Sequence, residues 1–104
     1  MAQVVWTEPA LQDLDAIADY IALDKPEAAR ALVQRIFAHT DHLASHPQIG
    51  SLPRELKGKR YRQIIEPPCR IFYRHDASEN ICLIVHVMRS EQRLRKPALQ
   101  RKRQ

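Results

Sequence analysis

Apolar residues in the first part of the chain recur with the spacing of an amphipathic helix. A β-rich segment, residues 3–7, comes first, and apolar residues then fall at positions 10, 11, 14, 17, 18 and 21, which share one helical face. Thr7 is a suitable N-cap, and Glu8 and Pro9 suit the first turn of a helix. The pattern predicts a strand over 3–7 and a helix that begins after Thr7. Trp6 and Tyr20 are expected to pack in the core or between helices.

A second apolar stripe, over residues 29–43, predicts a second helix. The turn before it spans residues 23–26, and Asp24 and Glu27 have the spacing of a capping box. Proline disfavours helix at the residue before it, so this helix should end just ahead of Pro47. Because the connection is short, the two helices are expected to form an antiparallel hairpin.

The second half of the chain is rich in β-formers. Residues 47–58 hold both glycines and read as a loop, and three β-rich runs follow over 61–66, 69–75 and 81–89. Prolines 67 and 68 separate the first two runs, and a polar turn separates the last two, which is typical of an antiparallel meander. The last run is the most apolar and is expected at the centre of the sheet.

These elements together predict an α+β fold of order β-α-α-β-β-β, in which a helix hairpin packs on one face of a small, mainly antiparallel sheet. A short helix can follow at residues 91–94. We expect residues 1–96 to form a single domain and residues 97–104 to form a basic, frayed tail. Neither a membrane-length apolar run nor a signal peptide is found, so the expected compartment is the cytoplasm, without a membrane partner.

Charge is distributed unevenly along the 104 residues. Residues 1–53 hold three basic and seven acidic residues, a net charge of −4, whereas residues 54–104 hold 14 basic and five acidic residues, a net charge of +9. Such an asymmetry favours an anionic partner, either nucleic acid or an acidic protein segment. A solvated basic face is the plainer alternative.

Common catalytic motifs are absent, and no cofactor is expected. His39, His42 and His46 share a helix face, which permits a metal site, but a clear further ligand is lacking and we expect exposed polar residues and no metal. Cys69 and Cys82 fall inside predicted strands and are expected to be small buried apolar residues.

Six arginines lie on or beside the three predicted strands: Arg60, Arg62, Arg70, Arg74, Arg89 and Arg93. Side chains alternate across a strand, so Arg60 should share a face with Arg62, and Arg70 with Arg74. We expect adjacent strands to bring these pairs together and Arg89 to join them. Gathered cations repel one another and favour a bound anion, phosphate or carboxylate, although solvated arginines that protect a sheet edge are an alternative.

Five segments, in this order, resemble the RelE/ParE superfamily of bacterial type II toxins: residues 4–10, 13–21, 46–50, 69–74 and 84–90. The resemblance implies a small cytoplasmic toxin, encoded beside an antitoxin that wraps it. RelE-like members are ribosome-dependent endoribonucleases that cut messenger RNA, whereas ParE-like members inhibit DNA gyrase and are not enzymes. The long helix hairpin, with the Asp-Lys-Pro-Glu-Ala-Ala break, is similar to the ParE branch.

For this chain the resemblance therefore implies a gyrase inhibitor that is not an enzyme, with a RelE-like ribonuclease as the alternative and a binding module that only retains the fold as a third reading. A ribonuclease would use Arg62, Arg70, Arg89 and His86, the last as a substitute for an acid that is missing after Arg89. For a gyrase inhibitor, we expect the target to contact Arg89, Arg93, Arg95 and Lys96.

The implied antitoxin is ParD-like. Its acidic residues are expected to bind Arg60, Arg62, Arg70 and Arg74, and its helix to enter an apolar groove between helices and sheet. A homodimer of the free chain is left open.

Overall fold

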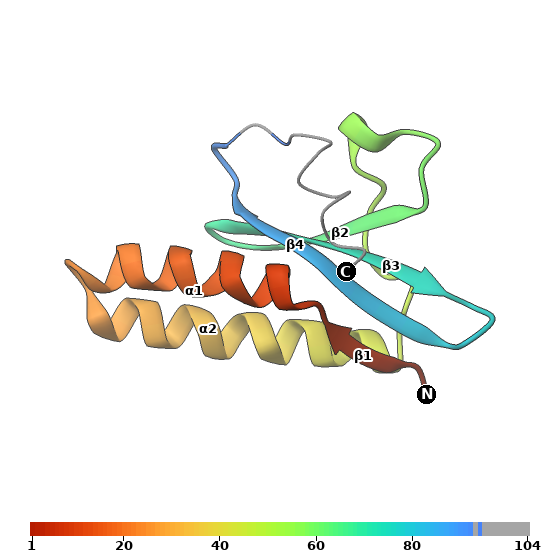
Figure 1. Cartoon of the computed structure of the whole chain (residues 1–104), viewed down its shortest axis with the longest axis horizontal. Coiled ribbons are helices and arrows are strands. Elements are labelled where there is room, and N and C mark those ends of the chain that lie inside the picture. The colour runs from red at the N-terminus through yellow and green to blue at the C-terminus, as the bar shows by residue number, and fades with distance from the viewer. Residues whose placement is uncertain (93, 95–104) are drawn as a thin grey trace.

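A four-stranded sheet lies at the centre of the fold, and two antiparallel helices cover one of its faces (Figure 1). This computed structural model describes residues 1–92 and residue 94. In chain order the elements are β1 (Gln3–Trp6), α1 (Glu8–Ala22), α2 (Pro26–Asp41), η1 (His42–Ala44), η2 (Arg54–Leu56), β2 (Tyr61–Glu66), β3 (Cys69–Asp76) and β4 (Ile81–Arg89). The predicted order and the α+β class are confirmed.

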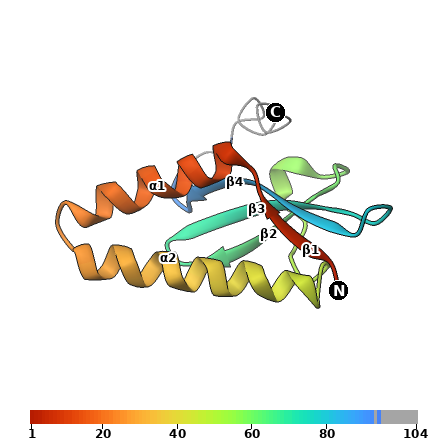
Figure 2. The same ribbon diagram turned by 60° about the horizontal axis from the view of Figure 1, so that its bottom comes forward.

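The strands lie in the order β1-β4-β3-β2 (Figure 2). β2, β3 and β4 form an antiparallel meander, and β1 pairs with β4 in parallel. The expected central place of the last strand is confirmed, since β4 lies between β1 and β3. Most β4 residues are buried whichever face they point to, which explains why this strand is the most apolar.

The start of α1 is as predicted. Thr7 precedes the helix in an extended conformation, and its Oγ1 accepts a hydrogen bond from the backbone N–H of Ala10 at 3.3 Å. The same hydroxyl donates to the carbonyl oxygen of Ile84 in β4 at 2.9 Å, and the Thr7 N–H donates to that oxygen as well. One residue thus ends β1, starts α1 and attaches both to the central strand.

The predicted capping box before α2 is wrong. Lys25 is the N-cap, it has an extended φ of −137°, and its side chain makes no capping hydrogen bond. Pro26 occupies the first helical position and disfavours the helical region for the residue before it, so the helix cannot begin at Asp24 or Lys25. At the other end, α2 stops at Asp41 and continues as the single turn η1, short of Pro47.

The main core lies between the helices and the sheet. It contains Leu14 of α1, Leu32 and Ile36 of α2, and Ile71 and Ile84 of the sheet, all nearly inaccessible to solvent. Cys69 and Cys82 belong to the same cluster, as predicted, and burial raises the pKa of the Cys69 thiol to about 11 and also raises that of Cys82. Both thiols are therefore unreactive near neutral pH.

A smaller apolar cluster covers part of the opposite face of the sheet. Leu56 of η2 packs there against Phe72, Val85 and Met88, together with Leu94. The segment before β2 therefore folds back over the face that the helices leave open. None of the described helices is long and apolar enough to cross a membrane.

Trp6 and Tyr20, both predicted to pack in the core or between the helices, differ in their burial. The Trp6 ring lies 5.0 Å from that of Phe37 in α2, as expected for a packing aromatic. Tyr20, in contrast, is 62% exposed, so its predicted packing role is wrong. Position 20 falls outside the buried stripe of α1, because that stripe follows residues 10, 14, 17 and 21.

At the expected C-terminal helix, Ser90 to Gln92 form a turn, and Arg93 lies outside the described residues.

Gly50 attaches the loop before β2 to the sheet. Its N–H donates to the Tyr73 hydroxyl at 2.9 Å, and its carbonyl oxygen accepts from Arg62 Nη1 at 2.8 Å. The next residue, Ser51, pairs with Gln63 through two backbone hydrogen bonds. A Cβ atom on Gly50 would lie 2.6 Å from the Gln63 carbonyl oxygen and 2.7 Å from the Tyr73 ring, so only glycine fits.

We expect Gly50→Ala to lower the free energy of unfolding by about 1–3 kcal/mol, because the new methyl group meets backbone and a buried ring. Chemical denaturation monitored by circular dichroism measures the change. Ser51→Ala, at the exposed neighbouring position, is the matched control and should stay within about 0.5 kcal/mol of the wild type. Equal stability of Gly50→Ala and the wild type would contradict the close approach.

Candidate interaction surface

The arginines of the meander do not form one cluster, which corrects the expectation from the sequence. Arg62 is opposite Tyr73 and Arg89 is opposite Cys69, and both of those partners face the helices. Arg70 and Arg74 alternate with them and share the open face with Phe72. Adjacent strands place directly opposite residues on one face, and the register pairs Arg62 with Tyr73 rather than with Arg70 or Arg74. The register between the strands, which could not be predicted from the sequence, therefore places the arginines on two different faces of the sheet.

Arg70 is held in place by three neighbours on the open face. Its Nη1 and Nη2 each donate to a Glu55 carboxylate oxygen at 2.9 Å, and its Nε donates to Gln63 Oε1 at 2.8 Å. The guanidinium carbon also lies 4.8 Å from the centre of the Phe72 ring. The Arg70 hydrogen bond, with smaller backbone and charge effects, holds the pKa of Glu55 below its ordinary value. Arg70 therefore already has a carboxylate partner from the same chain.

The remaining arginines differ in their surroundings. Arg62 donates to the Gly50 carbonyl oxygen and is part of the loop attachment. Arg60 is exposed just before β2, and Arg74 is half-buried opposite Tyr61; within the described residues neither makes an ion pair. Arg93, Arg95 and Lys96 lie outside the described residues. Of the four arginines expected to bind an antitoxin, Arg60 and Arg74 are the two without internal ion pairs or hydrogen bonds in the described part of the chain.

His86 is bound to a carboxylate from α1. Its Nδ1 lies 2.8 Å from Asp13 Oδ2, and the same oxygen accepts from the Val87 N–H at 3.3 Å. A carboxylate only accepts, so Nδ1 carries the proton. β1 ends at Trp6, opposite Ile84, and a bulge interrupts the β3–β4 register between Phe72 and Tyr73. Asp13 therefore accepts a hydrogen bond from a backbone N–H of β4 at a position that β1 is too short to pair with.

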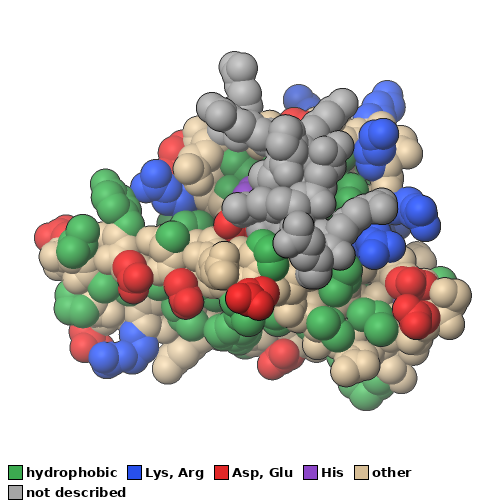
Figure 3. Space-filling model, in the orientation of Figure 1, with side chains coloured by type: hydrophobic (Ala, Val, Ile, Leu, Met, Phe, Trp, Pro, Cys, Tyr) green, Lys and Arg blue, Asp and Glu red, His purple; other side chains and the backbone are tan. Residues whose placement is uncertain are grey.

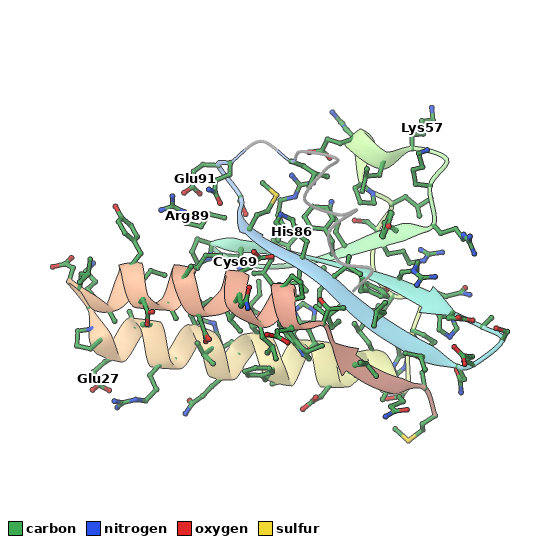
Figure 4. The ribbon with its side chains drawn as sticks, viewed as in Figure 1. Glu27, Lys57, Cys69, His86, Arg89 and Glu91 are labelled. Atoms are coloured by element: carbon green, nitrogen blue, oxygen red, sulfur yellow. The ribbon has the colours of Figure 1, made fainter. Side chains whose placement is uncertain are left out.

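Arg89 lies at the end of β4 on the helix side of the sheet (Figure 4). Its guanidinium carbon is 5.1 Å from the centre of the Tyr20 ring, and its Nε is 3.3 Å from Glu91 Oε1. Leu23, three residues after Tyr20, is 86% exposed. Tyr20 and Arg89 are thus in contact on the surface, and the exposed Leu23 lies about one helical turn after Tyr20.

His39, His42 and His46 do not share one set of contacts. His39 turns to Glu66 of β2, with 3.1 Å between Nδ1 and Oε1, whereas the rings of His42 and His46 stack 4.5 Å apart. Glu66 also accepts from Arg35 Nε at 3.3 Å. His39 is therefore part of a contact between α2 and β2. Within the described residues, no group of three or more potential ligands is placed to hold a metal ion.

The loop before β2 carries basic residues that were not among the expected site residues. Arg54, Lys57 and Lys59 are exposed there, next to Arg60. Space-filling Figure 3 shows basic side chains gathered at this end of the molecule and acidic side chains in a row along α1. The available signal was the basic run Lys-Gly-Lys-Arg over residues 57–60.

Comparisons with known proteins assign this small α+β chain to the RelE/ParE superfamily. The sequence model of the family described as the ParE toxin of the type II toxin–antitoxin system parDE matches residues 4–94. The chain belongs to this family and is a toxin of a type II toxin–antitoxin system.

Individual proteins agree with this assignment. The chain is 40% identical to Toxin RelE2 of Caulobacter vibrioides over 94 residues, which cover 86% of this chain and 99% of the relative. The solved structure titled as a chromosomal ParDE system from P. aeruginosa is 29% identical, with a TM-score of 0.72 over 88% of this chain and 98% of that one. The RelBE2 toxin–antitoxin complex from Mycobacterium tuberculosis is 27% identical, with a TM-score of 0.57 over 85% and 96% of the two chains.

We expect Glu55→Gln to lower the free energy of unfolding at pH 7 by about 0.5–1 kcal/mol, a small value because the Glu55 side chain is 41% exposed and the pair is screened. Because the folded-state pKa of Glu55 is lowered, its contribution is present at neutral pH and is lost as the pH falls through that lowered pKa. Denaturation at several pH values should therefore show the difference between variant and wild type shrinking in acid.

Glu79→Gln, in the β3–β4 turn, is the matched control, since the Glu79 side chain is exposed and makes no ion pair in the described part of the chain. It should leave stability unchanged. A stability difference for Glu55→Gln that is the same at neutral and acid pH would contradict the ionic character of the contact.

Proposed function

We propose that this toxin inhibits DNA gyrase by protein–protein binding, without chemistry of its own, and that a ParD-like antitoxin neutralises it. The inhibitor would trap the covalent complex of gyrase with cleaved DNA. A ribonuclease of this superfamily would need Arg62, Arg70, Arg89 and His86 together. The observation that carries the proposal is that Arg62 and Arg89 lie on the helix side of the sheet, apart from Arg70 and His86, and that Arg70 is bound by Glu55. The family match and the ParDE structural neighbour support the same branch.

Cleavage of an RNA backbone needs cations around one phosphate and a proton donor aimed at the leaving oxygen. Arg62 and Arg89 lie on the helix side of the sheet, and Arg70, on the open face, is neutralised by Glu55. A phosphate that bound Arg70 would have to displace a two-point carboxylate contact and would meet the repulsion of Glu55. This arrangement favours an inhibitor that acts by binding.

The target surface that we propose is the end of the helix hairpin beside β4. Tyrosine and arginine are enriched among the residues that dominate protein–protein binding energy. Tyr20 and Arg89 supply this pair, and Leu23 adds exposed apolar surface. Arg93, Arg95 and Lys96 follow directly in the chain and stay part of the proposal.

The antitoxin contact that we propose uses the open face of the sheet. Arg74 lies on this face near the end of β3, and the exposed Arg60 lies just before β2; both can bind carboxylates without breaking internal ion pairs in the described part of the chain. Arg62 and Arg70 would have to exchange internal partners first. The expected acidic segment of a ParD-like antitoxin would supply the carboxylates.

A RelE-like ribonuclease is the second candidate, and one specific observation favours it. Arg70, Phe72 and His86 form a row on adjacent strands, with the Phe72 and His86 rings 5.9 Å apart. Asp13 fixes the His86 ring, as a carboxylate does for many catalytic imidazoles. The relative Toxin RelE2 also carries the name of that branch.

The purified toxin should inhibit DNA supercoiling by gyrase, and Arg89→Ala should raise the concentration needed for half inhibition about tenfold or more, because it removes a proposed binding hot spot. Gel assays of plasmid supercoiling measure both effects. Arg30→Ala on α2 is the matched control, since Arg30 is exposed and paired only with Glu27 of its own helix in the described structure. It should leave inhibition unchanged.

The same proteins should be tested for cleavage of ribosome-bound messenger RNA. Full supercoiling in the presence of toxin, together with messenger cleavage that His86→Asn abolishes, would replace the inhibitor proposal by the ribonuclease. Asparagine retains a donor toward Asp13, so this variant tests proton transfer more than folding.

Arg74→Glu should weaken the complex with the cognate antitoxin about tenfold, because it places an acid where carboxylates are expected. Isothermal titration of the purified pair measures the affinity. Lys25→Glu, in the turn between the two helices, makes the same charge change away from the open face and should have little effect. Unchanged binding by Arg74→Glu would remove this electrostatic contact from the proposal.

A further inference from the structure

A basic loop, residues 54–60, projects from the open face of the sheet (Figure 1). It contains Arg54, Lys57, Lys59 and Arg60 and a single acid, Glu55. Glu55 is bound by Arg70, so its charge is already matched inside the fold. None of the four cations makes an ion pair or side-chain hydrogen bond within residues 1–92 and 94.

The loop is held in a defined conformation. Leu56, its apolar residue, is only 4% exposed and packs against Phe72, Val85 and Met88. The Lys59 N–H donates to the Leu56 carbonyl oxygen at 2.9 Å, and Gly58 has a φ of 82°, which suits glycine in a tight turn. The buried Leu56 side chain and the Glu55–Arg70 ion pair therefore hold the backbone of the loop in place. The four basic residues of the loop are exposed on this backbone. Figure 4 shows Lys57 at the outer end of the loop, away from the sheet.

The net charge of α1 has the opposite sign. α1 carries Glu8, Asp13, Asp15 and Asp19 and no lysine or arginine. Figure 3 shows acidic side chains along α1 and basic side chains beside the loop. A polyanion would be repelled by α1 and attracted to the loop. The electrostatic field of the protein would therefore orient it toward the loop.

We propose that the basic loop binds the phosphate backbone of nucleic acid, without reading bases. Backbone binding needs only clustered lysine and arginine donors, and its affinity comes largely from the release of counterions. The acidic antitoxin segment proposed above for Arg74 and Arg60 is a poorer match for the rest of the loop, because protein hot spots are enriched in aromatic anchors and the one apolar side chain of this loop is buried. The inference goes beyond the proposed function and does not depend on gyrase as the target.

The test is binding of the purified full chain to a fluorescent 20-base-pair DNA duplex, measured by anisotropy at several salt concentrations. Lys57→Gln with Lys59→Gln should weaken binding about tenfold or more near 0.1 M salt, and should lower the slope of log K against log salt by about 1.8, or about 0.9 for each lost phosphate contact. Lys25→Gln with Arg30→Gln removes the same charge from the helix hairpin and should keep affinity and slope close to those of the wild type. Thermal melts establish that both variants fold.

Three outcomes would overturn the inference. Equal weakening by the two double variants would show an effect of net charge alone. No salt-dependent binding of the wild type to duplex DNA, or to a single-stranded RNA with the same number of phosphates, would exclude a nucleic-acid surface. Tighter binding to a polyglutamate peptide of equal charge would identify an acidic protein partner. The assay contains no gyrase, so supercoiling data on the same variants keep this inference and the proposed function separately testable.

Discussion

The attachment of α1 to the central strand β4 is the contact on which the rest of the structure depends. Thr7 caps α1 and binds the Ile84 carbonyl oxygen, and two turns later Asp13 binds His86 and the Val87 N–H. Together these two residues form hydrogen bonds with backbone groups of β4 where β1 ends, and they hold the helix hairpin over the core. β4 can then be buried on both faces, β3 pairs with it, and the open face of the sheet is positioned relative to the helices.

The alternation of a strand explains how the charge is used. One run of arginines in the sequence becomes two sets, because Arg62 and Arg89 point to the helix side and Arg70 and Arg74 to the open face. Some of these arginines already bind carboxylate or carbonyl oxygens of the same chain; Arg70, for example, binds Glu55. The cations that remain for partners are Arg74 near the end of β3, those of the loop before β2, and those at the end of the helix hairpin. A protein that acts by binding at several sites is consistent with this distribution.

Family membership and detailed function come from different levels of the structure. The ParE toxin family match and the fold establish a type II toxin. The distinction between the two possible targets depends on a few side chains, such as Arg70 and His86. Whether these side chains can bind a phosphate depends on their own partners, which are distant in the sequence. Arg70 and Glu55 are 15 residues apart, and His86 and Asp13 are 73 apart. Both branches of the superfamily share the scaffold, so such contacts carry the distinction.

The sequence determined what depends on local patterns. Periods of 3.6 and 2 gave the order of helices and strands and most of their bounds, although α2 ends at Asp41, well ahead of Pro47, and the apolar excess of residues 81–89 placed that strand at the centre. It did not show that Tyr20 is exposed, that Pro26 overrides the capping box, or that the arginines divide between two faces. Only the tertiary structure decided those points, because strand register, the bulge in β4 and the partners of each charge arise from pairings between distant segments, whose geometry no local spacing records.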